Sequence, residues 1–167
     1  MLPTLAAIPI FTLLVIFQTS IVSYVPLLYG YADIVLLVII AWALQENVKT
    51  AWQWSILGGL MVGWVSAMHI AIPIVSYLGI TALALIIRQR IWQLPILAMF
   101  VVTLIGTLFS HALSALMLSI GGTALPWQDT LQLITLPSLF LNILLAAPVY
   151  AIIRDFANWM HPEEIQI

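Results

Sequence analysis

Charged residues are scarce in this 167-residue chain and make up only 6% of it. Hydrophobic residues reach 64%, and the mean hydropathy is +1.19. Soluble domains carry roughly 25% charged residues, and a surface with so few charges could not keep a domain of this size dissolved in water. We therefore expect lipid to be the main solvent of this protein.

Cysteine is absent altogether, which excludes disulfides, thiolate metal sites and cysteine catalysis. Basic clusters are missing too, because the chain has four Lys and Arg residues against six Asp and Glu residues. Nucleic-acid-binding proteins show a basic patch or stripe, so we expect no nucleic-acid partner. No cofactor motif is present either, and the expected partners are the lipid bilayer and other membrane proteins.

Long apolar runs are what the sequence does contain. A helix needs roughly 20 residues to cross about 30 Å of hydrocarbon. Runs separated by polar residues or by Pro and Gly predict an all-α integral membrane protein, with six transmembrane helices in one bundle and a single domain over residues 1–167. The first run lacks the basic start of a signal peptide, so we retain it as a span. The expected spans are 5–24, 29–45, 52–68, 72–87, 92–120 and 131–153.

The positive charges indicate an orientation. All four fall in loops or ends that six crossings place on one side, and the opposite loops contain no Lys or Arg. The positive-inside rule then puts both termini in the cytoplasm. The residues concerned are Lys49, Arg88, Arg90 and Arg154. We also expect tryptophans to anchor at the interfaces, with Trp52, Trp54, Trp92 and Trp159 at the inner one and Trp127 at the outer one.

Small and polar residues recur every fourth position in three spans, and such stripes allow helices to approach closely in lipid. We expect the stripes in spans three and five to pack the bundle, whereas the more polar stripe in span six is expected to contact another helix, in this chain or in a partner. The stripes are Ser55, Gly59, Gly63 and Ala67; Gly106, Ser110 and Ser114; and Ser138, Asn142, Ala146 and Tyr150.

Two prolines in span six, Pro137 and Pro148, each free a backbone carbonyl four residues earlier, so we expect a kink at each. Asn142 lies between them and could bond a neighbouring backbone. Asp33 begins span two, where its carboxylate could cap the helix N-terminus. His111 is expected to bond a nearby serine or carbonyl. No nucleophile setting, metal spacing or phosphate loop is present, and we expect no enzymatic activity.

The segment "LPSLFLNILLAAPVYAIIRDF" resembles the closing segment of the rod shape-determining protein MreD family. That pattern is a Leu-Pro-small start, a central Asn, a Pro-aliphatic-Tyr group and a basic end. The stretches "VIFQTSIV", "ADIVLLVIIAWAL", "GGLMVGW" and "LGITALALIIRQRIW" are similar to earlier parts of the family in the same order. Ala32 replaces the family's usual proline, and Ala67 stands where many relatives carry an aspartate.

The resemblance implies a non-catalytic subunit of the bacterial cell-elongation complex in the inner membrane. Such a subunit pairs with the single-span protein MreC, and through it with MreB filaments and with the glycosyltransferase and transpeptidase that build peptidoglycan. A homo-oligomer is left open. The candidate residues for partner contact or helix shaping are Asp33, Gly59, Gly63, Pro137, Ser138, Asn142, Pro148 and Tyr150.

The family's fold resembles that of the substrate-binding components of energy-coupling-factor transporters, which supplies an alternative function. A solute-binding component of a vitamin-type transporter would need polar and aromatic residues that converge from several helices within an apolar wall. The residues that could contribute are Trp127, Gln128, Asp129, Tyr29 and Tyr31. An intramembrane enzyme is the third and least supported interpretation, because no acid pair or metal cluster is present.

Overall fold

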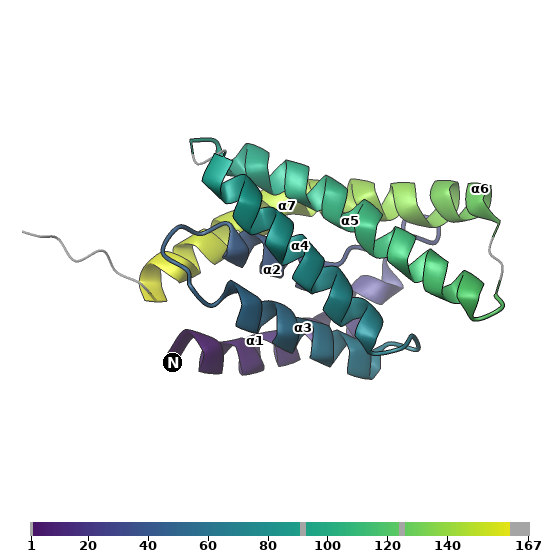
Figure 1. Ribbon diagram of the computed structural model, residues 1–167, viewed down its shortest axis with the longest axis horizontal. Coiled ribbons are helices and arrows are strands. Elements are labelled where there is room, and N and C mark those ends of the chain that lie inside the picture. The colour runs from purple at the N-terminus through teal and green to yellow at the C-terminus, as the bar shows by residue number, and fades with distance from the viewer. Residues whose placement is uncertain (1, 91–92, 124–125, 161–167) are drawn as a thin grey trace, which may run out of the picture.

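The computed structural model describes residues 2–90, 93–123 and 126–160, with side chains from residue 4 onward (Figure 1). The described secondary structure is helical, apart from an isolated bridge between Leu27 and Gly30. The elements are α1 (Leu2–Ser20), η1 (Val22–Tyr24), α2 (Ile34–Ala43), α3 (Ala51–Val65), α4 (Ala71–Arg90), α5 (Pro95–Ile120), α6 (Trp127–Asp129), the π-helical η2 (Thr130–Thr135) and α7 (Leu136–Met160).

Four helical segments are long and apolar enough to cross a membrane. They overlap the predicted spans 5–24, 72–87, 92–120 and 131–153, although residue 92, and Trp92 with it, lies outside the described residues. The last segment joins α6, η2 and α7 into one continuous helical run. The four segments are Thr4–Tyr24, Ala71–Arg90, Pro95–Ile120 and Trp127–Met160.

The other two predicted spans form shorter helices. The expected span 29–45 is helical only in α2, which has 10 residues, and the expected span 52–68 corresponds to the 15 residues of α3. At 1.5 Å per residue these helices are about 15 Å and about 22 Å long. The length expected for span two as a helix is therefore wrong, because residues 29–33 are non-helical and lie against α7.

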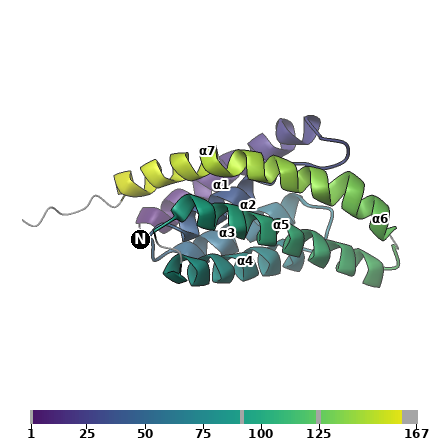
Figure 2. The ribbon, with the colours of Figure 1, turned by 90° about the horizontal axis from the view of Figure 1, so that it is seen from above.

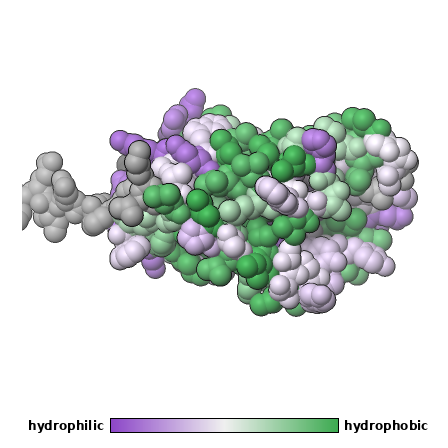
Figure 3. All heavy atoms as spheres, turned by 90° about the horizontal axis from the view of Figure 1, so that it is seen from below, coloured by the Kyte–Doolittle hydropathy of each residue, from purple (hydrophilic) through white to green (hydrophobic). Residues whose placement is uncertain are grey.

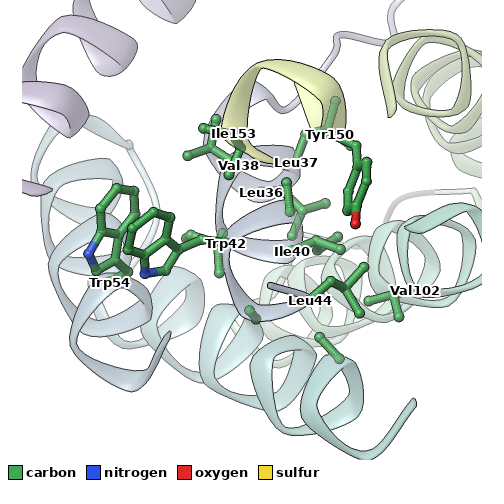
Figure 4. Close-up of a cluster of buried hydrophobic side chains, with 14 of the residues drawn as sticks. Leu36, Leu37, Val38, Ile40, Trp42, Leu44, Trp54, Val102, Tyr150 and Ile153 are labelled. Carbon is green, nitrogen blue, oxygen red and sulfur yellow. The ribbon is translucent and has the colours of Figure 1, made fainter. Parts of the chain in front are cut away.

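Helix α2 forms the centre of the molecule, and all ten of its residues are buried. It contacts α1, α3, α4, α5 and α7, and Figure 4 shows its side chains meeting those of several neighbouring helices. Trp42 stacks on Trp54 of α3 with ring centroids 4.0 Å apart. Trp54 is fully buried inside the chain, so its ring does not serve as the predicted anchor in the lipid headgroups. Trp52 and Trp159 are exposed, as interface anchors would be.

The small residues of α3 pack that helix against α4. A Cβ atom on Gly59 would lie 2.8 Å from Ile74 Cα, and one on Gly63 would lie 2.6 Å from Ile70 Cγ1. Such distances leave no room for a side chain, so the glycines permit the close approach of the two helices. The predicted small face of span three is thus occupied within the chain at Ser55, Gly59 and Gly63, whereas Ala67, also predicted on this face, lies beyond the end of α3 and is exposed.

The basic residues gather at one end of the bundle. Lys49 precedes α3, Arg88 and Arg90 end α4, and Arg154 is near the end of α7, and these helix ends lie together at the left of Figure 1. The turns between α3 and α4 and beyond α5 lie at the opposite end (Figure 1). In the surface view, apolar side chains cover much of the middle and hydrophilic ones gather toward the left-hand end (Figure 3).

Candidate functional site

Residues 28–33, here called the strap, join α1 and η1 to α2 and run along α7. Alternate backbone amides of the strap donate hydrogen bonds to the continuous helical run of η2 and α7, and two of the three acceptors, Ser138 and Asn142, belong to the polar stripe predicted for span six. The bonds are Tyr29 N to Leu133 O at 3.0 Å, Tyr31 N to Ser138 Oγ at 3.0 Å, and Asp33 N to Asn142 Oδ1 at 2.7 Å.

Pro137 explains why the strap can bond α7 at its start. Proline has no N–H, so the carbonyl of Leu133 lacks its usual helical donor, and Tyr29 N supplies one instead. The π-helical segment η2 ends immediately before α7 at this place. Gly30 lies against the same turn, where a Cβ atom would be 2.6 Å from the Ser138 backbone nitrogen. The expected local irregularity at Pro137 therefore forms the docking position for the strap.

At Pro148 the helix is not interrupted. Residues on both sides of it belong to α7, which extends to Met160. Figure 2 shows α7 bowed along the bundle rather than broken.

The N-terminus of α2 is capped by one side chain of the strap and one of α1. Asp33 Oδ1 accepts from Leu36 N at 2.9 Å, as predicted for an N-cap residue. Gln18 Oε1, from α1, accepts from Ile34 N at 2.9 Å and from Val35 N at 3.3 Å. The first turn of a helix has N–H groups without intrahelical partners, and in this interior each of those three N–H groups receives an acceptor.

Two further helices contribute side chains at the start of α2. The cluster of Gln18, Asp33, Tyr77, Thr107 and Asn142 is here called the polar junction. The Tyr77 hydroxyl of α4 donates to both carboxylate oxygens of Asp33, at 3.2 and 3.0 Å. Asn142 Nδ2 donates to Thr107 Oγ1 of α5 at 3.0 Å. Asn142 therefore uses both ends of its amide inside the chain, and side chains from α1, the strap, α4, α5 and α7 converge near the start of α2.

The predicted stripe on span six faces the interior. Ser138, Asn142, Ala146 and Tyr150 are between 0% and 5% exposed. Tyr150 lies at the other end of α2, where it lines a hollow together with Gln45 and Arg88. Arg88 Nη1 donates to the carbonyls of Ala43 and Gln45 at 3.2 and 2.6 Å, which covers the C-terminal end of α2. These predicted residues shape the fold, and their contact with a partner stays a prediction.

A polar cavity of about 120 Å³ lies beside the junction. Asp33 and Tyr77 line it, together with Ser76 of α4 and with Ser110 and Ser114 of α5. His111, predicted to bond a serine or a carbonyl, instead has Nδ1 3.2 Å from Thr135 Oγ1 of η2.

An apolar groove is lined by residues of α1, α2 and α7. Its volume is about 310 Å³, and only apolar side chains line it. Each helix contributes residues at a spacing of four, so the groove consists of parallel helical ridges. These residues are Ile10 and Leu14 of α1, Ile34 and Val38 of α2, and Val149, Ile152, Ile153 and Phe156 of α7.

Sequence reasoning assigned no role to Gln18 and Tyr77 of the junction or to Gly30 of the strap. Gln18 and Tyr77 are hydrogen-bonding groups within apolar runs, which is the signal that could have identified them. Gly30 gives no such signal. A side chain at this position would clash with residues more than 100 positions later in the sequence, at the start of α7.

Among the described residues, no group of three or more His, Cys, Asp or Glu side chains could hold a metal ion. Comparison of the chain with protein-family models, with curated proteins and with solved structures gives no match. Any functional conclusion therefore depends on the sequence resemblance and on the geometry described above.

Proposed function

We propose that this protein is a non-catalytic membrane scaffold whose groove between α1 and α7 holds the transmembrane helix of a single-span partner. The groove is the observation that carries the proposal. It presents three rows of apolar side chains at i, i+4 spacing, and such rows are the ridges into which another helix packs. In lipid, where no hydrophobic force drives association, this shape complementarity supplies the attraction.

The interior position of the polar groups supports the same conclusion. Asn142 and Ser138 are bonded to the strap, Gly59 is covered by Ile74 of α4, and Gly63 is covered by Ile70, directly before α4. A partner helix cannot reach these groups without displacing part of the chain. The groove remains the large apolar concavity at which a helix can be received without such a rearrangement.

The resemblance to the MreD family identifies the partner in this proposal as MreC. The protein would then belong to the elongation complex of the bacterial inner membrane and would help to control cell shape and peptidoglycan synthesis. The clustering of Lys49, Arg88, Arg90 and Arg154 at one end of the bundle supports a cytoplasmic position for that end and for both termini. In this proposal α2 and α3, with their flanking segments, complete six crossings.

The transporter alternative finds less support in the hollows of the molecule. Pockets for small organic ligands usually measure roughly 300–1,000 Å³ and contain a few placed polar groups. The polar cavity beside Asp33 is about 120 Å³, which is too small for a vitamin. The groove is larger, at about 310 Å³, but offers no polar group to orient a solute.

Site-specific cysteine crosslinking tests the scaffold directly, because the natural chain has no cysteine. Ile152→Cys places a thiol in the groove, where the side chain is 67% exposed. Ile86→Cys is the matched control, since this α4 residue is 59% exposed and lies outside the groove. Each variant would be co-expressed with MreC variants that carry single cysteines along the transmembrane helix.

We expect Ile152→Cys to form a disulfide with MreC cysteines on one face of its helix, at intervals of three or four residues. Ile86→Cys should form none. Equal crosslinking of both positions, or crosslinking of Ile86→Cys alone, would show that the partner does not occupy the groove.

A further inference from the structure

The polar cavity beside Asp33 differs from the other hollows in its lining. Six of its residues carry oxygen-bearing side chains, contributed by the strap, the α3–α4 connection, α4 and α5, and no Lys, Arg or His lines it. Its volume of about 120 Å³ would accommodate roughly four waters at ~30 Å³ each. The six residues are Asp33, Ser66, Ser76, Tyr77, Ser110 and Ser114.

Ser76 is the first sign that the cavity holds a ligand. Its side chain is 0% exposed and its Oγ has no hydrogen-bond partner in the structure. An unsatisfied buried hydroxyl is costly, and in a membrane interior this cost is not relieved by bulk water. Thr103 Oγ1 is the other buried side-chain oxygen without a partner among the described residues, and it lies outside the cavity.

The charge of Asp33 is the second sign. Within the described part of the chain the ion pair is that of Arg154 with Asp155, so no basic side chain neutralises Asp33. Leu36 N and the Tyr77 hydroxyl bond the carboxylate, Gln18 and Val35 N also donate to it, and the N-terminus of α2 contributes about half a positive charge. Asp33 is therefore held by hydrogen-bond donors, and its charge has no cationic side-chain partner among the described residues.

We propose that this cavity binds one monovalent metal cation of about the size of sodium. Carboxylate and hydroxyl oxygens are hard ligands, which favour alkali and alkaline-earth ions over soft transition metals. One carboxylate balances a single positive charge, whereas calcium sites in proteins draw on several carboxylates and carbonyls. Asp33 and Ser76 are the principal ligands, and the remaining coordination comes from the other hydroxyls and from water.

This inference is independent of the scaffold function, because the residues that line the cavity and those that line the groove do not overlap. A bound cation would hold the strap, α4 and α5 together through Asp33. The sodium dependence of stability can therefore be measured on the protein alone, without a partner.

The test compares thermal unfolding of the detergent-purified protein in sodium chloride and in N-methyl-D-glucamine chloride at equal ionic strength. The organic cation is too large for the cavity. We expect sodium to raise Tm by about 5–10 °C at roughly 100 times its Kd. Titration with radioactive sodium should give one bound ion per chain. Equal Tm values in the two salts, or no saturable sodium binding, would overturn the proposal.

Three variants locate the site. Asp33→Asn keeps an equally good N-cap residue but removes the charge, so the response of Tm to sodium should vanish. Ser76→Ala should reduce the response. Thr103→Ala removes the other unpartnered hydroxyl, outside the cavity, and should retain the full response. If Ser76→Ala and Thr103→Ala respond to sodium equally, Ser76 is no ligand and the site is wrongly placed.

Discussion

The two faces of α7 differ in polarity and in what they contact. The face with Ser138 and Asn142 is polar and is bonded to the strap and to α5 of the same chain. The face with Val149 and Ile152 is apolar and lines the groove, which no described segment fills. In lipid an unpaired polar group is costly, whereas an apolar surface is already solvated. The polar face is thus needed for folding, whereas the apolar face is not occupied by any described segment of the chain.

This comparison predicts that substitutions on the two faces of α7 have different consequences. Changes to the polar face should reduce stability, by an amount that depends on how many groups lose a partner. Changes to the groove face should leave stability unaltered and act on partner binding.

Gly30→Ala should have the largest effect. The added Cβ would lie 2.6 Å from Ser138 N and 2.7 Å from Ile134 O, both backbone atoms of the helical run that ends in α7. The strap must move away, and its bonds to α7 are then lost together. We expect a loss of about 3 kcal/mol or more, which corresponds to a fall in Tm of roughly 6–12 °C. Tryptophan fluorescence during heating in detergent measures it, and an unchanged Tm would show that the strap is not held against α7.

Asn142→Leu should have the next largest effect. It removes the acceptor of Asp33 N and the donor to Thr107 Oγ1, both in the interior. Interhelical bonds in membranes average below 1 kcal/mol in some proteins, but buried groups left unpaired cost about 1–3 kcal/mol each. We expect a loss of about 2 kcal/mol and a fall in Tm of roughly 4–8 °C. The control is Asn158→Leu, which lies further along α7 and has no such bonds in the described structure.

Ser138→Ala should have a smaller effect. It removes one bond, from Tyr31 N, and Tyr31 is 43% exposed, so water or a lipid headgroup can replace the lost acceptor. A loss of about 0.5–1 kcal/mol, measured as a fall in Tm of roughly 1–4 °C, is expected. A fall as large as that of Asn142→Leu would mean that this end of the strap is more deeply buried than its exposure indicates.

Ile152→Trp should leave stability within about 0.5 kcal/mol of the wild type. The Ile152 side chain is 67% exposed and lines the groove, so a larger apolar side chain there meets lipid and fills the space in which we propose that a partner helix binds. Ile86→Trp, on the exposed face of α4, is its control. A clear destabilisation by Ile152→Trp alone would show that the groove belongs to the packed interior.

Local signals in the sequence predicted the junction in part. Asp33 directly precedes an apolar run, and an N-cap depends only on the following turn, so its bond to Leu36 N could be foreseen. The spacing of Ser138, Asn142 and Tyr150 likewise placed them on one face of a helix. The partners of that face, the strap and Thr107, lie far away in the sequence and give no local signal.

Other features escaped prediction because lipid removes the contrast between inside and outside. Helix α2 is apolar all round, and such a pattern fits both a buried helix and one facing lipid. Its complete burial, and that of Trp54, depend on neighbours rather than on their own sequence. The groove could not be found either, because apolar residues on α1 and α7 are equally suited to contact lipid.

The most direct test of the central claim is capture of MreC by two variants that alter opposite faces of α7. Asn142→Leu and Ile152→Trp would each be co-purified with MreC in detergent, beside the wild type and Ile86→Trp, and each would be checked for monodispersity. Folded Asn142→Leu should still capture MreC, and Ile152→Trp should lose it. If folded Asn142→Leu loses MreC while Ile152→Trp retains it, the polar face is the interface and the groove is not.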